Sequence, residues 1–109
     1  MSRSFLEICN YALEKWGMTA QLDQMAEECA EYIVALNHYK RGRINESQLM
    51  DEIADVSIMV REMKIYFEHI ELKEERKIRR LNRKINREID KERGGVELAG
   101  FIHTTMSKF

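Results

Sequence analysis

The sequence contains no proline and only five glycines, so little in it interrupts regular backbone structure. Its two cysteines, Cys9 and Cys29, form no CxxC pair, which argues against a zinc or dithiol site. We expect both to be free, buried thiols in a reducing cytoplasm. The N-terminus lacks the apolar core of a signal peptide, and no uncharged apolar run approaches the roughly 18 residues of a membrane span. We therefore expect a soluble, cytoplasmic protein with no membrane partner.

Excess charge of one sign is also missing. The formal net charge is −1, so the overall charge indicates neither a polyanionic nor a polycationic partner. At 109 residues the chain is one domain long, and a domain this small leaves much apolar surface uncovered or completes its core by oligomerising. We expect a single all-α domain over residues 1–93, followed by a tail, 94–109, of unknown structure.

Helical periodicity predicts four helices. They are expected at about residues 4–17, 19–40, 45 to between 67 and 70, and 72–92. Ser4 with Glu7 has the spacing of a capping box, Thr19 and Asn45 can cap the second and third helices, and glycines follow the first and last. The predicted fold is a four-helix up-and-down bundle, completed by oligomerisation as a homodimer or homotetramer.

Two carboxylate pairs lie on consecutive predicted helices. Glu28 and Glu31 share one side of the second helix, and Glu52 and Asp55 lie on or beside the apolar arc of the third. Because an unpaired buried carboxylate costs several kcal/mol, Glu52 needs a cation or a hydrogen-bond network nearby. Oxygen-only ligands favour Mg²⁺, with Mn²⁺ as the alternative. The sequence therefore predicts a metal site made by these four residues.

Two other interpretations of the acidic residues must be weighed. With 19 Asp and Glu in the chain, a single Glu-x-x-Glu is commonly just a solvated helix face. A di-iron carboxylate bundle would need Glu-x-x-His pairs, and the chain has none. The histidines are better explained as surface or hydrogen-bonding groups, of which only His38 lies close to the acidic side of its helix.

The motifs together resemble a known family. Trp16-Gly17, Gln24-x-x-Glu27-Glu28-x-x-Glu31 and, twenty residues on, Asp51-Glu52-Ile53-Ala54-Asp55-Val56 are similar to MazG-like nucleotide pyrophosphohydrolases of the all-α NTP pyrophosphatase superfamily. The similarity covers roughly residues 16–84. It implies an enzyme, a hydrolase that converts a nucleoside triphosphate and water to the monophosphate and pyrophosphate, with attack of water at the α-phosphorus.

The resemblance also implies roles for single residues. Glu31 or Glu27 is the candidate catalytic base, and Lys77-x-x-Arg80 is similar to the basic pair that such enzymes direct at the substrate phosphates. Trp16 and Gln24 are possible contacts to the nucleobase of the substrate. An aromatic residue at the end of an apolar stripe, such as Trp16, nevertheless more often belongs to the core.

Two alternatives remain open at this point. The chain could be a non-catalytic helical assembly module, paired through the seam Ile78, Leu81, Ile85 and Ile89. The basic helix 73–93, with ten Lys or Arg against five Asp or Glu, could instead bind nucleic acid through its phosphates. Nucleic acid is the least favoured partner, because no aromatic residues interleave with the basic ones and no groove-reading motif is present.

Overall fold

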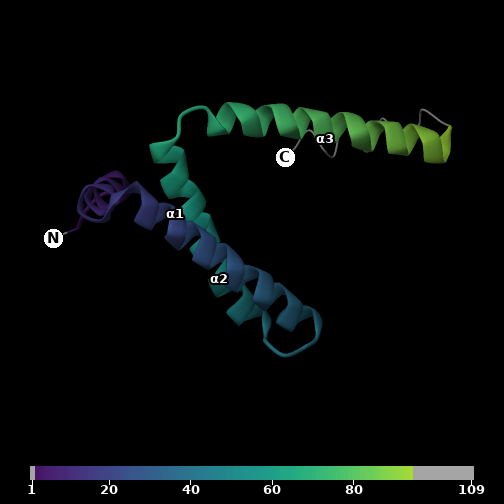
Figure 1. Cartoon of the computed structure of the whole chain (residues 1–109). Coiled ribbons are helices and arrows are strands. Elements are labelled where there is room, and N and C mark those ends of the chain that lie inside the picture. The colour runs from purple at the N-terminus through teal and green to yellow at the C-terminus, as the bar shows by residue number, and fades with distance from the viewer. Residues whose placement is uncertain (1, 95–109) are drawn as a thin grey trace. The chain divides into compact units, whose positions relative to one another are not determined.

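The computed structural model describes residues 2–94 and contains three helices: α1 (Phe5–Lys40), α2 (Glu46–Tyr66) and α3 (Ile70–Arg93) (Figure 1). No strand occurs among the described residues, so the predicted all-α class is confirmed. The chain divides into two compact units between Glu68 and His69. The single domain predicted over residues 1–93 stays a prediction. The tail predicted from residue 94 onward lies outside the described residues apart from Gly94.

The helix ends follow the signals in the sequence. The Ser4 side chain accepts a hydrogen bond from the Glu7 amide (3.1 Å), and Glu7 Oε1 accepts one from the Ser4 amide (3.3 Å). Asn45 and Gln48 repeat this reciprocal capping box at the start of α2, with distances of 2.8 and 2.9 Å. Each box satisfies amides that have no partner inside the helix. The predicted starts at Ser4 and Asn45 are therefore confirmed.

Gly17 makes a corner inside α1 rather than ending a helix. Its backbone (φ 85°, ψ 164°) lies in a region that essentially only glycine adopts. The helical pattern resumes directly afterwards, so the first two predicted helices form one bent element (Figure 1). Thr19 accordingly does not begin a separate helix. The described residues contain three helices instead of four, and a four-helix bundle is not seen in the single chain.

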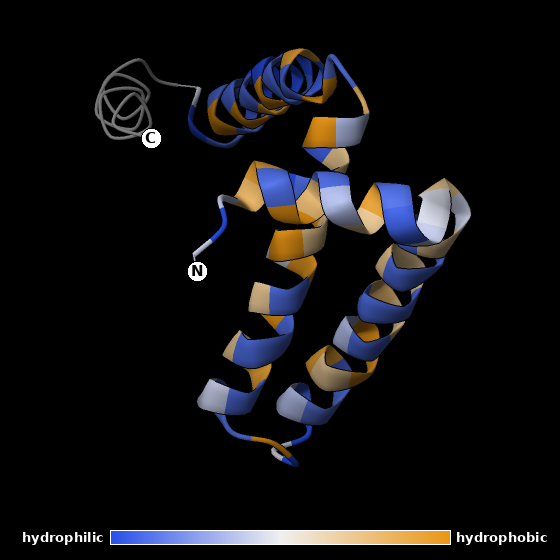
Figure 2. Cartoon of the chain, turned by 90° about the vertical axis from the view of Figure 1, so that its left-hand side faces the viewer, coloured by the Kyte–Doolittle hydropathy of each residue, from blue (hydrophilic) through white to orange (hydrophobic). Residues whose placement is uncertain are grey.

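The first unit is a helical hairpin. The part of α1 after Gly17 runs antiparallel to α2, and a short turn joins the two helices (Figures 1 and 2). In the turn, the Arg43 amide donates to the His38 carbonyl (2.8 Å), and Gly42 takes a positive φ of 71°. The buried apolar residues of the hairpin are few: Cys9, Ala35, Leu49, Met59 and Met63. The prediction of free thiols is confirmed, with Cys9 buried and Cys29 half-buried.

Helical periodicity alone would place Leu22 and Ile33 on the inner side of α1, in one stripe with Met25, Cys29 and Leu36. The last three are half-buried, whereas Leu22 and Ile33 are 43% and 58% exposed. Gln21 and Ala35 are buried instead, and Glu28 is half-buried. The hairpin therefore turns part of its polar side inward and leaves apolar side chains on its surface. Residues of hydrophobic type recur along both helices (Figure 2).

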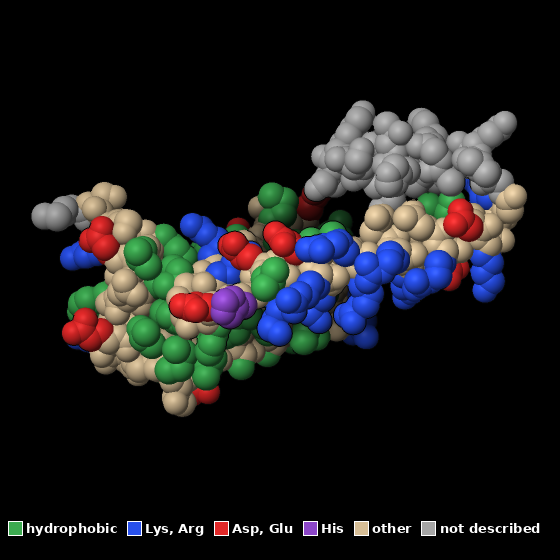
Figure 3. All heavy atoms as spheres, turned by 90° about the horizontal axis from the view of Figure 1, so that it is seen from above, with side chains coloured by type: hydrophobic (Ala, Val, Ile, Leu, Met, Phe, Trp, Pro, Cys, Tyr) green, Lys and Arg blue, Asp and Glu red, His purple; other side chains and the backbone are tan. Residues whose placement is uncertain are grey.

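Helix α3 belongs to the second unit and has no buried residue. Lys and Arg side chains crowd along it (Figure 3), and Ile78 and Leu81 are 64% and 54% exposed. Gly94, with φ 54°, ends the helix as predicted. None of the described helices combines the length and apolar character that a membrane crossing requires.

Candidate functional site

Three of the four predicted metal ligands meet between α1 and α2. Glu28, Glu31 and Glu52 each offer a carboxylate oxygen, and these oxygens all lie within 4.8 Å of one another. Glu28 and Glu31 are neighbours on α1 because residues three apart lie almost one turn apart on the same side of a helix. The antiparallel α2 brings Glu52 opposite them. We call Glu28, Glu31 and Glu52 the acidic cluster.

Two oxygens of the acidic cluster are buried without a partner. Oε2 of Glu28 and Oε2 of Glu52 are inaccessible to solvent and accept no hydrogen bond. The other oxygen of Glu28 accepts a bond from Gln24 Nε2 (2.9 Å). Leaving a buried acceptor unsatisfied costs about 1–3 kcal/mol, and more when the group is charged. The cluster therefore has vacant acceptor capacity that a cation or a protonated ligand would fill.

The carboxylates of the acidic cluster also repel one another electrostatically. The negative charge of Glu28 raises the pKa of Glu31 above its ordinary value, and burial and the charges of Glu52, Glu27 and Asp55 add to the effect. Like charges so close together disfavour ionisation of all of them at once. Glu31 therefore keeps its proton to a higher pH than an isolated glutamate does.

The remaining acidic candidates lie at the edge of the cluster. Asp55 is exposed and does not share the close arrangement of the three glutamates, although its charge acts on Glu31. Glu27 is also exposed and acts on Glu31 in the same way. Asp55 as a ligand, and Glu27 or Glu31 as catalytic base, stay predictions.

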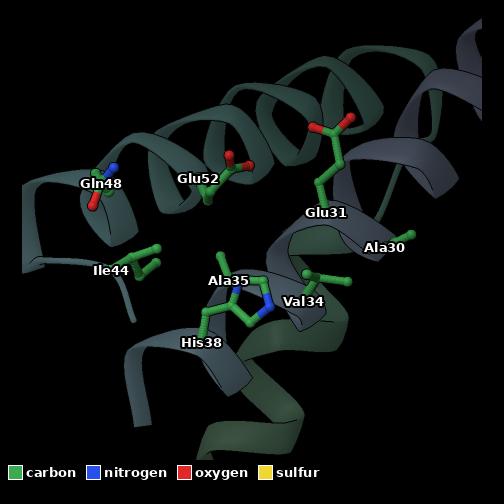
Figure 4. Close-up of a pocket in the computed structure, with 8 residues that line it drawn as sticks. All are labelled: Ala30, Glu31, Val34, Ala35, His38, Ile44, Gln48 and Glu52. Atoms are coloured by element: carbon green, nitrogen blue, oxygen red, sulfur yellow. The ribbon is translucent and has the colours of Figure 1, made fainter. Parts of the chain in front are cut away.

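A groove of about 460 Å³ adjoins the acidic cluster (Figure 4). Residues of α1, of α2 and of the turn between them line it: Ala30, Glu31, Val34, Ala35, His38, Ile44, Gln48 and Glu52. Glu31 and Glu52 belong to both the cluster and the groove. An apolar groove with a few polar groups and a carboxyl of perturbed pKa is the usual form of a small-molecule site.

Trp16 and Gln24, the residues predicted to contact the nucleobase, do not line this groove. Gln24 donates to Glu28 and so supports the cluster itself. Trp16 is 60% exposed and meets the Tyr11 ring edge-on, with centroids 6.3 Å apart. Its assignment to the core is therefore wrong for the single chain. Contact of Trp16 or Gln24 with the nucleobase stays a prediction.

The predicted phosphate-binding pair lies on α3. Lys77 and Arg80 are both exposed and border a shallow hollow together with other basic residues, Lys73, Arg76 and Arg83. Since α3 belongs to the second unit, the contribution of this pair to the acidic cluster also stays a prediction.

Sequence reasoning missed one buried carboxylate, Glu62. It is only 8% exposed, and its Oε2 accepts no hydrogen bond. Nearby, the Tyr66 hydroxyl donates to the Cys9 carbonyl (2.7 Å) and so ties the start of α1 to the end of α2. Burial, followed by the charge of Glu62, raises the pKa of Tyr66 to about 12. The position of Glu62 next to Met63 and one turn from Met59 was a usable signal, because it suggests burial as it did for Glu52.

Comparison of the chain with protein-family models, with curated proteins and with solved structures gave no match.

Proposed function

We propose that the protein is a Mg²⁺-dependent nucleotide pyrophosphohydrolase that converts a nucleoside triphosphate and water to the monophosphate and pyrophosphate. The observation that carries the proposal is the convergence of Glu28, Glu31 and Glu52, with two buried carboxylate oxygens left unpaired. The spacing of the acidic motifs resembles that of MazG-like enzymes, and the proposed reaction is the one that this resemblance implies.

The residues fit a hard divalent cation. All the converging atoms are carboxylate oxygens, and no His or Cys joins them among the described residues. Glu28, Glu31 and Glu52 would hold Mg²⁺, or Mn²⁺ in its place, with Asp55 one turn beyond Glu52 as the fourth ligand. When bound, such an ion supplies charge neutralisation between carboxylates and phosphates and makes a coordinated water more acidic.

Side chains of the protein would take up the proton of the attacking water and stabilise the leaving pyrophosphate. Glu31 is exposed to solvent at the edge of the groove, which suits a base that takes the proton of the attacking water, provided that the metal does not fully engage its carboxylate. Glu27 is the second candidate for this role. Lys77 and Arg80 would neutralise the charge that develops on pyrophosphate as the bond between the α-phosphorus and the bridging oxygen breaks.

Self-association belongs to the same proposal. Leu22 and Ile33 leave an apolar side of α1 exposed, as do Met50 and Ile53 on α2. A second copy that covers these residues would complete a four-helix arrangement from two hairpins, as a homodimer or within a homotetramer. We expect gel filtration with light scattering to give an even number of chains, and Ile33→Lys to reduce it.

The decisive experiment resolves the products of a panel of ribo- and deoxynucleoside triphosphates in the presence of Mg²⁺. Pyrophosphate and the monophosphate are expected, with activity lost in Glu28→Gln and reduced at least tenfold in Asp55→Asn. Asp51→Asn, on the exposed side of α2, is the matched control and should retain activity. Release of orthophosphate in place of pyrophosphate, or full activity in Glu28→Gln, would reject the proposal.

A non-catalytic assembly module is the second candidate, because the exposed apolar side chains of both units suit an oligomer without requiring catalysis. It predicts the same assembly but no Mg²⁺ dependence. Titration of the protein with Mg²⁺, followed by thermal unfolding, separates the two: a module shows no shift in Tm.

A further inference from the structure

Charge is distributed unevenly along the chain, although the formal net charge is only −1. Residues 1–68 contain seven Lys or Arg against twelve Asp or Glu, whereas residues 73–93 contain ten against five. The two units that divide between Glu68 and His69 therefore carry opposite excess charge. An asymmetry of this kind favours a polyanionic partner for the basic part of a chain.

The basic residues of α3 occupy one side of the helix. At 100° per residue, all nine Lys and Arg between residues 73 and 91 fall within an arc of about 160°. Among the acidic residues of α3, only Asp90 falls in the same arc. All nine basic residues are exposed, and such side chains crowd along α3 in Figure 3. We call these nine residues the basic side of α3: Lys73, Arg76, Lys77, Arg79, Arg80, Arg83, Lys84, Arg87 and Lys91.

The basic side keeps positive charges that the protein does not neutralise. Arg79 pairs with Glu75 (Nη2 to Oε2, 3.6 Å), whereas Arg76, Arg83 and Arg87 make no ion pair among the described residues. Basic side chains alone, within the described part of the chain, line a hollow of about 440 Å³ on this side. Like charges gathered around a hollow raise the local concentration of anions.

The basic side is longer than a bound triphosphate requires. It extends about 27 Å from Lys73 to Lys91, because each helical residue adds about 1.5 Å. A triphosphate carries about four negative charges, for which Lys77, Arg80 and a divalent cation suffice. A nucleic acid duplex carries one negative charge per about 1.7 Å of its axis, and so about 16 charges over the same length. The length and charge of the basic side therefore suit an extended polyphosphate.

Two observations favour a duplex over other extended polyanions. No aromatic residue occurs in α3, whereas proteins bind single strands largely by stacking bases on aromatic side chains. Glu71 and Glu92 lie within the arc of the apolar stripe that runs from Ile78 to Ile89. Insertion of that stripe into an anionic membrane would bring their carboxylates to a negative surface. Contacts to duplex phosphates need neither aromatic residues nor a motif that reads the bases.

We propose that the basic side of α3 binds the phosphate backbone of a nucleic acid duplex without reading its sequence. This activity is additional to the proposed hydrolysis and does not depend on it. Lys77 and Arg80 are shared by the two proposals. Arg76, Arg83 and Arg87 lie about 80–120° around the helix from Lys77 and serve the duplex alone.

The test is fluorescence anisotropy of a labelled duplex of about 20 base pairs with the full chain, in EDTA, over a series of NaCl concentrations. The logarithm of the association constant should fall against the logarithm of the salt concentration with a slope of about −4 or steeper, as for at least four neutralised phosphates. The triple variant Arg76→Gln, Arg83→Gln and Arg87→Gln should make the slope shallower by about 2–3 and weaken binding at least tenfold near 0.1 M salt. Glutamine is nearly as good a helix former as arginine, so α3 should persist, which circular dichroism checks.

The matched control removes the same charge from the first unit. Lys40→Gln, Arg41→Gln and Arg43→Gln together change three exposed residues at the turn of the hairpin. This variant should bind the duplex as wild type does. Full affinity in the α3 variant, or an equal loss in both variants, would overturn the inference.

Competitors identify the polyanion. A single strand of the same length, inorganic tripolyphosphate and vesicles of phosphatidylserine with phosphatidylcholine should each displace the duplex only at a higher concentration of phosphate groups. Displacement by any of them at an equal or lower concentration, or no duplex binding at about 50 mM NaCl, would overturn the inference. Duplex DNA and duplex RNA are both measured, and binding of either supports it. Duplex binding without hydrolysis of any triphosphate would reject the hydrolase proposal only, and hydrolysis without duplex binding would reject this inference only.

Discussion

Replacement of Glu52 by glutamine should stabilise the metal-free protein and strongly reduce its response to Mg²⁺. The carboxylate has a buried oxygen without a partner and stands close to two other glutamates. Glutamine keeps the size of the side chain and removes its charge. Unusually for a buried position, the substitution should therefore raise the free energy of unfolding.

The magnitude follows from the separation of the ligand oxygens. Two unit charges 4.8 Å apart repel by about 0.9 kcal/mol in water and by about 3.5 kcal/mol at an effective dielectric constant of 20. Glu28 and Glu52 are half-buried and Glu31 is exposed, so solvent screens part of the repulsion. We expect a gain of about 1–2 kcal/mol without metal, or roughly 4–16 °C in Tm for a domain of this size.

The assay is urea unfolding with a chelator and then with excess Mg²⁺. Wild type should gain about 2.7 kcal/mol once Mg²⁺ reaches a hundred times its Kd, whereas Glu52→Gln should gain much less. Asp51→Asn controls for the loss of one negative charge on α2. The argument is refuted if Glu52→Gln destabilises the metal-free protein, or if Mg²⁺ stabilises both proteins equally.

Three further outcomes are expected. Gly17→Ala should reduce the free energy of unfolding by about 1–3 kcal/mol in urea melts, since alanine is strained at φ 85° although the space around Gly17 is open; an unchanged midpoint would contradict this. The neutral Tyr66 phenol contributes stability that is complete below pH 10 and lost between pH 10 and 12, where the unfolded chain releases the proton first; Tyr66→Phe should lack this part of the alkaline loss in denaturant titrations. Lys77→Glu combined with Arg80→Glu should raise KM for the triphosphate at least tenfold and leave the Mg²⁺-induced shift in Tm unchanged; an unchanged KM would exclude the pair from the site.

The helix ends could be predicted from the sequence because their determinants are local. Ser4 and Asn45 each act within three residues, and Gly94 acts through its own φ. The side of α1 that packs inward could not be predicted in this way. Its apolar stripe through Leu22 and Ile33 is the side that periodicity selects, yet a chain that associates can keep that side for a partner.

The candidate site was predictable only in part. The spacing within each Glu-x-x-Glu or Glu-x-x-Asp pair follows from helix geometry, and so does the proximity of Glu28 to Glu31. The meeting of Glu52 with that pair depends on the register of the hairpin, which the turn at Arg41–Asn45 sets. The orientation of Gln48 depends on its double role as cap and groove lining, which becomes visible only in three dimensions.

The short turn between α1 and α2 also bears on how fast the acidic cluster assembles. Glu52 lies about twenty positions after Glu31 in the chain. Closing so short a loop costs little conformational entropy and proceeds in well under a millisecond. The cluster therefore arises together with the hairpin, early in folding, and its repulsion opposes that first step. If the proposed Mg²⁺ site is correct, the cation should accelerate folding as well as slow unfolding, so that it would act as a template for the hairpin.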